Sequence, residues 1–208
     1  MDGLLLDSER LARDAFEEAC ADIAATVAPE IYLRCIGSSW DATRVVLTEA
    51  LGSAERYESL SRRWEERYQA RIDAGEVQLK PGARELIAAL EAASIPRAVA
   101  TSTLRPTATA KLAGAGILPS FACLICGGET PRGKPHPDPY LAAVAGLGTP
   151  AHLTWALEDS ENGVRSANAA GLHVIQVPDL VAPSVELLAL GHAVADSLHD
   201  VLEVLLQA

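Results

Sequence analysis

The sequence predicts an α/β protein with a Rossmann-like, doubly wound parallel sheet, accompanied by a helical subdomain. Two observations lead to this prediction. From residue 82 onward, short apolar, β-rich segments alternate with helical segments of about 10 residues. Residues 8–75, in contrast, show helical periodicity and no convincing strand. The 208 residues are enough for one or two domains whose core needs neither disulfides nor metals.

The helical subdomain is predicted by apolar residues at three- and four-residue spacing with charged residues between them. The clearest stretches are LARDAFEEACADIAATVA and ERYESLSRRWEERYQARI. We expect this subdomain to be inserted into the α/β part or appended to it.

The α/β part is predicted element by element from the alternation of strand-like and helix-like segments. The expected helices are 82–93, 107–116, 137–148, 161–171 and 196–206. The expected strands are 95–103, 121–128, 152–160 and 173–178, with a weak strand at 193–195.

Composition excludes several classes of partner and compartment. The net charge of -11 and the pI near 4.9 disfavour nucleic acid and anionic membrane surfaces. The longest apolar runs are far too short to span a membrane. Four irregularly spaced cysteines fit a reducing compartment, and the N-terminus MDGLLLDSER lacks the features of a signal peptide. We therefore expect a cytoplasmic protein.

Candidate functional residues follow three of the expected strands. In parallel α/β sheets ligands bind at the carboxyl ends of the strands, where the chain turns into the next helix. The segments at these positions are Thr101-Ser102-Thr103, Gly133-Lys134-Pro135 and Glu158-Asp159-Ser160. We expect hydroxyls, one ammonium group and two carboxylates to meet at one edge of the sheet.

Glu158 and Asp159 are adjacent acids at the end of an apolar strand. Unpaired buried charge is costly, and a hard cation such as Mg²⁺ would satisfy both carboxylates. The alternative is that Asp159 or Ser160 caps the following helix, which accounts for only one of the two acids.

Lys134 is one of only three lysines, against fourteen arginines, and it stands in a turn between glycine and proline. A compact ammonium group there could neutralise a phosphoryl group and a carboxylate; the alternative is a solvated loop lysine. Thr101 and Ser102 could hold phosphate oxygens, although hydroxyls at strand ends are also common turn formers.

Other residues favour structural roles. Cys123 and Cys126 are interpreted as buried strand cysteines, because no second pair with ligand spacing exists. Trp40, Trp64 and Tyr68 are interpreted as packing residues of the helical block rather than as a surface that closes over substrate. Most of its arginines are interpreted as solvated charges, although Arg10, Arg13, Arg34 and Arg44 could bind a second anionic group of a substrate.

The segments DGLLLDSE, VATST, GKPHPDPYL and LEDSENGVRSANAAG, in this order, resemble the motifs of the haloacid dehalogenase (HAD) superfamily. The resemblance is to the phosphoglycolate-phosphatase-like and β-phosphoglucomutase-like branch. It implies a HAD-like core at 1–7 and 78–208 and a helical cap domain at 8–77. It also implies Mg²⁺-dependent hydrolysis of a small phosphorylated metabolite through an aspartyl-phosphate, by a monomer or weak dimer that binds neither nucleic acid nor membrane.

The resemblance assigns roles to individual residues. It implies that Asp2 is the general acid/base, that Thr101 and Ser102 bind the phosphoryl group, and that Lys134 neutralises it. The catalytic set is therefore Asp2, Thr101 and Lys134.

The metal-ligating set implied by the same resemblance is Asp2, Glu158 and Asp159, with Asp2 contributing its backbone carbonyl.

The chain departs from the family pattern at its first motif. The nucleophilic aspartate is expected two residues before Asp2, at the end of a central first strand, and Met1 occupies the intervening position. Without that carboxylate the covalent reaction cannot start. The flanking strands could close up, another segment could fill the gap, or the natural protein could start upstream of Met1; we favour the last. The alternatives in function are a non-catalytic phosphate- or Mg²⁺-binding protein and a β-phosphoglucomutase-like mutase.

Overall fold

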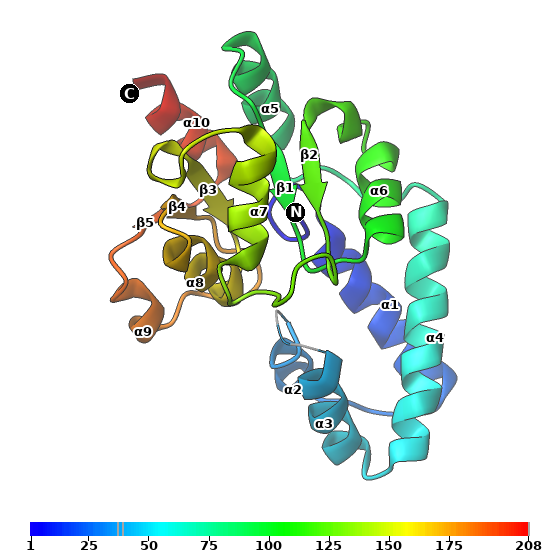
Figure 1. The fold of residues 1–208 in the computed structure, drawn as a ribbon. Helices are drawn as coiled ribbons and strands as arrows, with labels where there is room; N and C mark the ends of the chain where they lie inside the picture. Colours follow the sequence, from blue (N-terminus) through cyan, green and yellow to red (C-terminus); the bar gives the residue numbers. More distant parts are fainter. Residues whose placement is uncertain (37, 39, 208) are drawn as a thin grey trace. The chain divides into compact units, whose positions relative to one another are not determined.

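The computed structural model describes residues 1–36, 38 and 40–207, which form two compact units. One unit comprises Met1–Asp7 and Gln78–Ala208, and the other comprises Ser8–Val77 (Figure 1). The second unit is therefore inserted into the first along the chain. Its role as a cap over a substrate stays a prediction.

The Ser8–Val77 unit is helical throughout its described residues. Its helices are α1 (Ser8–Asp22), α2 (Pro29–Leu33), α3 (Trp40–Leu51) and α4 (Ala54–Asp73). Helices α1 and α4 pack side by side along their length (Figure 1). Ser53 caps α4 by accepting a hydrogen bond from the backbone N–H of Arg56, and Arg67 on α4 pairs with Glu18 and Asp22 on α1 at 2.8 and 2.7 Å. This unit carries no strand in its described part, as the sequence predicts.

Aromatic side chains form the centre of the helical unit. The ring of Phe16 lies 4.7 Å from that of Tyr32 and 5.0 Å from that of Trp64, centroid to centroid. The indole N–H of Trp64 donates to the carbonyl of Ala12 at 2.8 Å. The interpretation of Trp64 as a packing residue is thus confirmed, whereas the side chain of Trp40 lies outside the described part of the structure.

The α/β unit contains five short strands and six helices among its described residues. The strands are β1 (Ala98–Ala100), β2 (Cys123–Ile125), β3 (Trp155–Glu158), β4 (His173–Gln176) and β5 (Ala193–Val194). The helices are α5 (Ala83–Ala92), α6 (Arg105–Gly114), α7 (Asp138–Leu147), α8 (Glu161–Ala169), α9 (Val185–Leu188) and α10 (Leu198–Gln207).

All the strand pairs are parallel, but they form two sheets rather than one. The orders are β1–β2 and β3–β4–β5, with Ala98 opposite Cys123 and Trp155 opposite His173. Strands β1 and β3 do not pair with each other, so the flanking strands do not close up. The described residues 1–6 form a turn closed by bridges of Leu6 with Asp2 and with Leu79, not a strand between them. The α/β class with parallel strands and crossover helices is confirmed.

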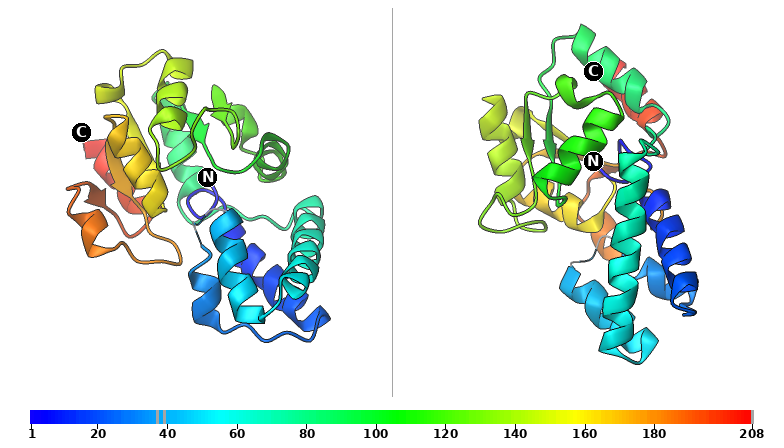
Figure 2. Two further views of the ribbon diagram at one scale, coloured as in Figure 1. Left: turned by 60° about the horizontal axis from the view of Figure 1, so that its bottom comes forward. Right: turned by 90° about the vertical axis from the view of Figure 1, so that its right-hand side faces the viewer.

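Helices pack on the strands of both sheets, and one apolar cluster covers part of this packing. Helix α7 contacts β1 and β2, helix α8 contacts β3 and β4, and α5 packs against α10 (Figure 2). The cluster joins α7, α8, α9, β3 and β4 through residues such as Val144, Val164, Val174 and Leu187. Burial of these side chains fixes the loops that follow the strands.

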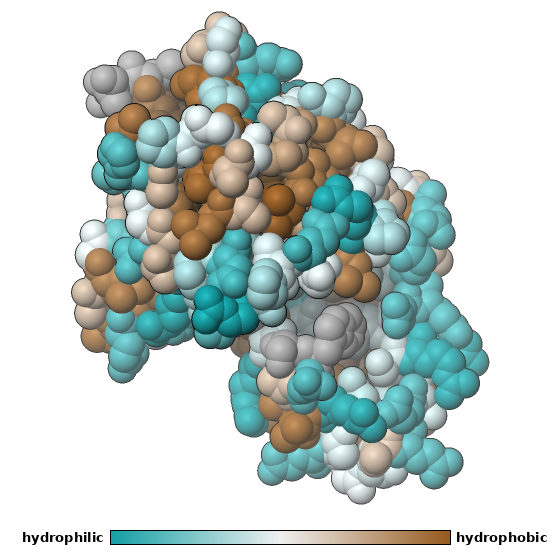
Figure 3. Space-filling model, viewed as in Figure 1, coloured by the Kyte–Doolittle hydropathy of each residue, from teal (hydrophilic) through white to brown (hydrophobic). Residues whose placement is uncertain are grey.

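The surface differs between the elements. Apolar residues gather over the α/β unit near α7, while the outer side of α4 is hydrophilic (Figure 3). This agrees with the sequence of α4, in which charged residues predominate. In the part of the chain that the structure describes, no helix combines the length and apolar character needed to span a membrane.

Candidate active site

Lys134 joins the ends of the two sheets. It lies in the loop that follows β2, and its Nζ donates to the carbonyl of Ala100 in β1 at 3.0 Å and to Oε1 of Glu158 at the end of β3. The side chains of Lys134 and Glu158 are 8% and 4% exposed. The alternative of a solvated loop lysine is therefore wrong, and the carboxyl ends of β1 and β3 meet at this ammonium group.

Glu158 is a buried carboxylate with several donors. The hydroxyl of Tyr140 on α7 donates to the same oxygen as Lys134, and the Ser160 hydroxyl donates to Oε2 at 3.1 Å. Burial alone would raise the pKa of Glu158, but the charges of Lys134 and of the Met1 ammonium, with the hydrogen bonds from Lys134 and Tyr140, outweigh it and lower the pKa below its usual value. Glu158 is therefore held as an anion inside the unit.

Tyr140 and Gly163 shape the surroundings of that anion. Burial, followed by the charge of Glu158, raises the pKa of Tyr140 well above its usual value, so this hydroxyl stays a donor. The ammonium of Lys134 also lies 5.1 Å from the Tyr140 ring centroid. A Cβ at position 163 would clash with both carboxylate oxygens of Glu158, so glycine is required in the first turn of α8.

The loop after β1 carries the predicted hydroxyl residues. Thr101 is buried, and its Oγ1 accepts a hydrogen bond from the backbone N–H of Thr103 at 3.1 Å. Ser102 is exposed. The structure thus places this loop at the same edge as Lys134, as the motif order predicts.

Asp2 is held by two donors. Lys111 of α6 pairs with Oδ1 at 2.6 Å, and the Thr103 hydroxyl donates to Oδ2 at 2.7 Å. Lys111 is itself buried, with 4% of its side chain exposed. The N-terminal turn is thereby fixed to the loop after β1 and to α6.

Asp159 lies against the same turn. Gly3 has φ +70°, and a Cβ there would clash with Oδ2 of Asp159 and lie 3.5 Å from Oδ2 of Asp179. Asp179, in the loop after β4, pairs with Lys80 at 2.5 Å. Because residue 3 is glycine, the carboxylates of Asp159 and Asp179 can lie close to its backbone.

The helix-cap alternative accounts for Ser160 only. Its side chain accepts from the backbone N–H of Gly163 at 3.2 Å and caps α8. Glu158 and Asp159 are left for other roles.

The motif resemblance implies Mg²⁺, and the donor chemistry at this edge fits such an ion. Asp2, Glu158 and Asp159 supply oxygen atoms, which hard cations prefer. Within the described residues, however, no three histidine, cysteine, aspartate or glutamate side chains are already gathered around one point. The lysine partners of Asp2 and Glu158 offset part of the negative charge.

Sequence reasoning missed Tyr140, Gly163 and Lys111 as contributors to the site, and it named Thr103 only as a hydroxyl of the loop, not as a partner of Asp2. Lys111 had the clearest signal, since it is a rare lysine in a helix of mostly small and apolar residues. Its partner Asp2 lies 109 positions away, so only the fold reveals the pair.

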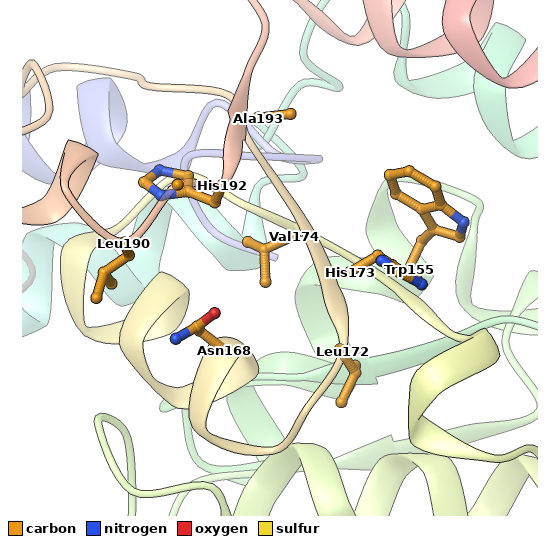
Figure 4. Close-up of a pocket in the computed structure, with 9 residues that line it drawn as sticks. Trp155, Asn168, Leu172, His173, Val174, Leu190, His192 and Ala193 are labelled. Carbon is orange, nitrogen blue, oxygen red and sulfur yellow. The ribbon is translucent and has the colours of Figure 1, made fainter.

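A cavity lies at the opposite ends of the strands. It measures about 320 Å³ and is lined by Trp155 and His173 at the starts of β3 and β4, by Asn168 of α8 and by His192 before β5 (Figure 4). Because it opens at the amino ends, it is separate from the edge that carries the predicted residues.

The structure places Cys123 at the start of β2 and Cys126 directly after its end. Cys123 and Cys126 are free thiols, and burial raises the pKa of both. The interpretation as buried strand cysteines holds only in part, because Cys123 is in β2 but half-buried, and Cys126 is buried but lies just beyond the strand.

A parallel α/β unit that gathers hydroxyls, a lysine and carboxylates at one edge, with a helical unit inserted after its first turn, defines an enzyme of the phosphatase-type hydrolase class. The family model described as haloacid dehalogenase-like hydrolase matches residues 1–177. The chain belongs to this family, which confirms the resemblance seen in its motifs.

Two curated relatives illustrate the similarity. Protein CbbY of Rhodobacter capsulatus is 34% identical over 187 residues, covering 86% of this chain and 82% of that protein. The probable pseudouridine-5'-phosphatase of Drosophila melanogaster is 38% identical over 185 residues, covering 86% and 79%.

Solved structures agree with the fold. A putative β-phosphoglucomutase from Thermotoga maritima superposes with a TM-score of 0.83 at 26% identity, covering 100% of this chain and 96% of that one. CbbY from Rhodobacter sphaeroides in complex with phosphate gives 0.76 at 29% identity, covering 97% and 93%.

Proposed function

We propose that this protein is a Mg²⁺-dependent phosphomonoester hydrolase that acts on a small phosphorylated metabolite. The observation that carries the proposal is the Lys134 ammonium, which reaches the carboxyl ends of β1 and β3 and lies beside the hydroxyl loop after β1. A cation and hydroxyls at such an edge suit a phosphoryl group.

The relatives suggest the substrate class. Their names include phosphorylated carbohydrates phosphatase, from Thermotoga maritima, and phosphoglycolate phosphatase, from Pectobacterium atrosepticum. A CbbY variant from Rhodobacter sphaeroides has been solved with xylulose-(1,5)bisphosphate. We infer a phosphorylated sugar or sugar acid as the substrate, and a cytoplasmic monomer or weak dimer as the working form.

Each residue has a defined task in this proposal. Thr101 and Ser102 hold phosphoryl oxygens, and Lys134 neutralises their charge. Asp2 gives a proton to the leaving oxygen and then takes one from the attacking water.

Asp159, with Asp2 and Glu158, would hold Mg²⁺, which when bound supplies positive charge against the phosphoryl oxygens. The covalent step needs a carboxylate nucleophile, which the family pattern places directly before Met1.

Turnover is tested with p-nitrophenyl phosphate and Mg²⁺ on two forms of the protein. One is the 208-residue chain, and the other carries an added apolar strand that ends in Asp directly before Met1. We expect turnover from the extended form, with a loss of about 10²–10⁴-fold in Asp2→Asn. Arg165→Gln, which changes an exposed charge on α8, is the control and should keep full activity.

Two results would contradict the proposal. Turnover by the 208-residue chain that survives Asp2→Ala and Asp159→Ala would rule out the assigned mechanism. Absence of turnover from both forms, with phosphate binding retained, would favour a non-catalytic phosphate-binding protein.

A mutase is the second candidate, favoured by the similarity to the putative β-phosphoglucomutase. Phosphorus NMR of the extended form with a sugar phosphate separates the two: a hydrolase releases inorganic phosphate, whereas a mutase returns an isomeric sugar phosphate.

A further inference from the structure

Lys111 is a buried cation for which the proposed reaction has no role. It lies in α6, a helix of mostly small and apolar residues, and only 4% of its side chain is exposed. A buried ammonium is costly unless a counter-charge compensates it. The Asp2 carboxylate, 2.6 Å away, provides that charge.

The pair also fixes the orientation of Asp2. Lys111 takes one carboxylate oxygen, and the Thr103 hydroxyl donates to the other at 2.7 Å. With both oxygens engaged, the side chain is held toward α6 and the loop after β1.

The same ammonium pairs with Asp2, one of the acids that a metal ion would use. Asp2 directly precedes Gly3, against whose α-carbon the Asp159 carboxylate lies. A divalent cation at Asp159 and the Asp2 carbonyl would therefore sit near a fixed positive charge, and Coulomb repulsion would weaken its binding.

We propose that Lys111 is a positioning residue that acts as a built-in cation: it orients the Asp2 carboxylate and lowers the affinity of this edge for divalent metal ions. The inference rests on the metal site of the proposed function. It concerns a lysine outside the four motifs, and it predicts that removing this lysine strengthens metal binding.

The test is isothermal titration of Mg²⁺, repeated with Mn²⁺, into the 208-residue chain and its variants. Lys111→Met removes the charge and keeps the length of the side chain, and we expect its metal affinity to rise by at least about threefold. Lys111→Arg keeps the charge and should bind like the unmodified chain. Arg97→Met, which removes a positive charge before the amino end of β1, is the matched control and should also bind unchanged.

Tighter metal binding by the uncharged variants would distinguish an electrostatic role of Lys111 from a merely structural one. Loss of a structural contact would loosen the site and lower its affinity for the metal ion. Lys111→Gln, which still hydrogen-bonds but carries no charge, serves as a second variant if Lys111→Met does not fold, and should show the same rise.

The outcomes separate the inference from the proposed function. If the unmodified chain binds the metal and the uncharged variants bind equally or more weakly, the inference about Lys111 is overturned and the metal site stands. If neither the unmodified chain nor any variant binds, the metal site fails and the inference fails with it.

Discussion

At the scale of single residues, the buried Glu158 carboxylate is held by donors from three elements. Lys134 comes from the loop after β2, Tyr140 from α7 and Ser160 from the start of α8. A carboxylate with such partners is a fixed anion, and it in turn fixes the ammonium of Lys134. The position of the candidate phosphate-binding cation thus depends on Glu158 and on the hydroxyls that hold Glu158 in place.

Tyr140→Phe removes one donor and leaves the ring in place. We expect a loss of about 1–3 kcal/mol in the free energy of unfolding, because a buried charged acceptor loses a hydrogen bond. Urea denaturation measures it. An unchanged midpoint would show that the hydroxyl contributes nothing to holding Glu158.

Gly163→Ala places a Cβ on the Glu158 carboxylate. We expect a loss of about 1–3 kcal/mol in the free energy of unfolding, because the carboxylate must move away from its donors. The matched control is Gly114→Ala near the end of α6, where a Cβ meets nothing within 4 Å. The control should be neutral or stabilising by up to about 1 kcal/mol; equal effects of the two substitutions would contradict this account.

At the scale of elements, β4 connects the site to the cavity at the other end of the sheet. Gln176 in β4 donates to the carbonyl of Asp159 at 3.4 Å, and its Oε1 accepts from His192, 2.8 Å away, which lines the cavity (Figure 4). Burial lowers the pKa of His192 below its usual 6.5, so the folded state favours the neutral ring.

This shift predicts a pH dependence of stability. The unfolded chain binds the proton at a higher pH than the folded chain, so the stabilisation is present above about pH 6.5 and is lost as the pH falls through the lowered pKa. Urea unfolding at pH 7.5 and pH 5.5 should show a smaller decrease for His192→Asn than for the unmodified chain. Equal decreases in both proteins would contradict the assigned role of His192.

Element types were predictable from the sequence more fully than element lengths. The sequence predicts one strand over 95–103, but β1 is only Ala98–Ala100, with backbone hydrogen bonds between Arg97 and Ala122 and between Thr101 and Ile125 at its two ends. Pro96 cannot donate to a ladder. The sequence does not predict helix α9, since four residues carry too little periodicity to detect.

The candidate site was predictable in outline only. Motif order placed Thr101, Lys134 and Glu158 at one edge, because strand ends in a parallel sheet meet there. Two ion pairs hold the side chains of the site in place. They join Lys134 with Glu158 and Lys111 with Asp2, which lie 24 and 109 positions apart in the sequence. Such contacts depend on how the helices pack, which local pattern does not encode.

At the scale of the whole molecule, the chain combines a helical unit at Ser8–Val77 with an α/β unit whose strands form two sheets. Lys134 links these sheets by contacting Ala100 in β1 and Glu158 in β3. The proposed phosphate-binding function and the link between the two sheets therefore depend on the same side chain.

The central claim, that this edge binds phosphate, is tested most directly by isothermal titration of inorganic phosphate into the 208-residue chain, Lys134→Met and Thr101→Val. We expect the unmodified chain to bind and both variants to lose at least about tenfold in affinity, since each removes a donor to a charged ligand. Thr101→Val leaves the Lys134–Glu158 ion pair intact, so a loss of affinity in this variant cannot result from breaking that pair. Binding of equal strength by all three proteins would contradict the account.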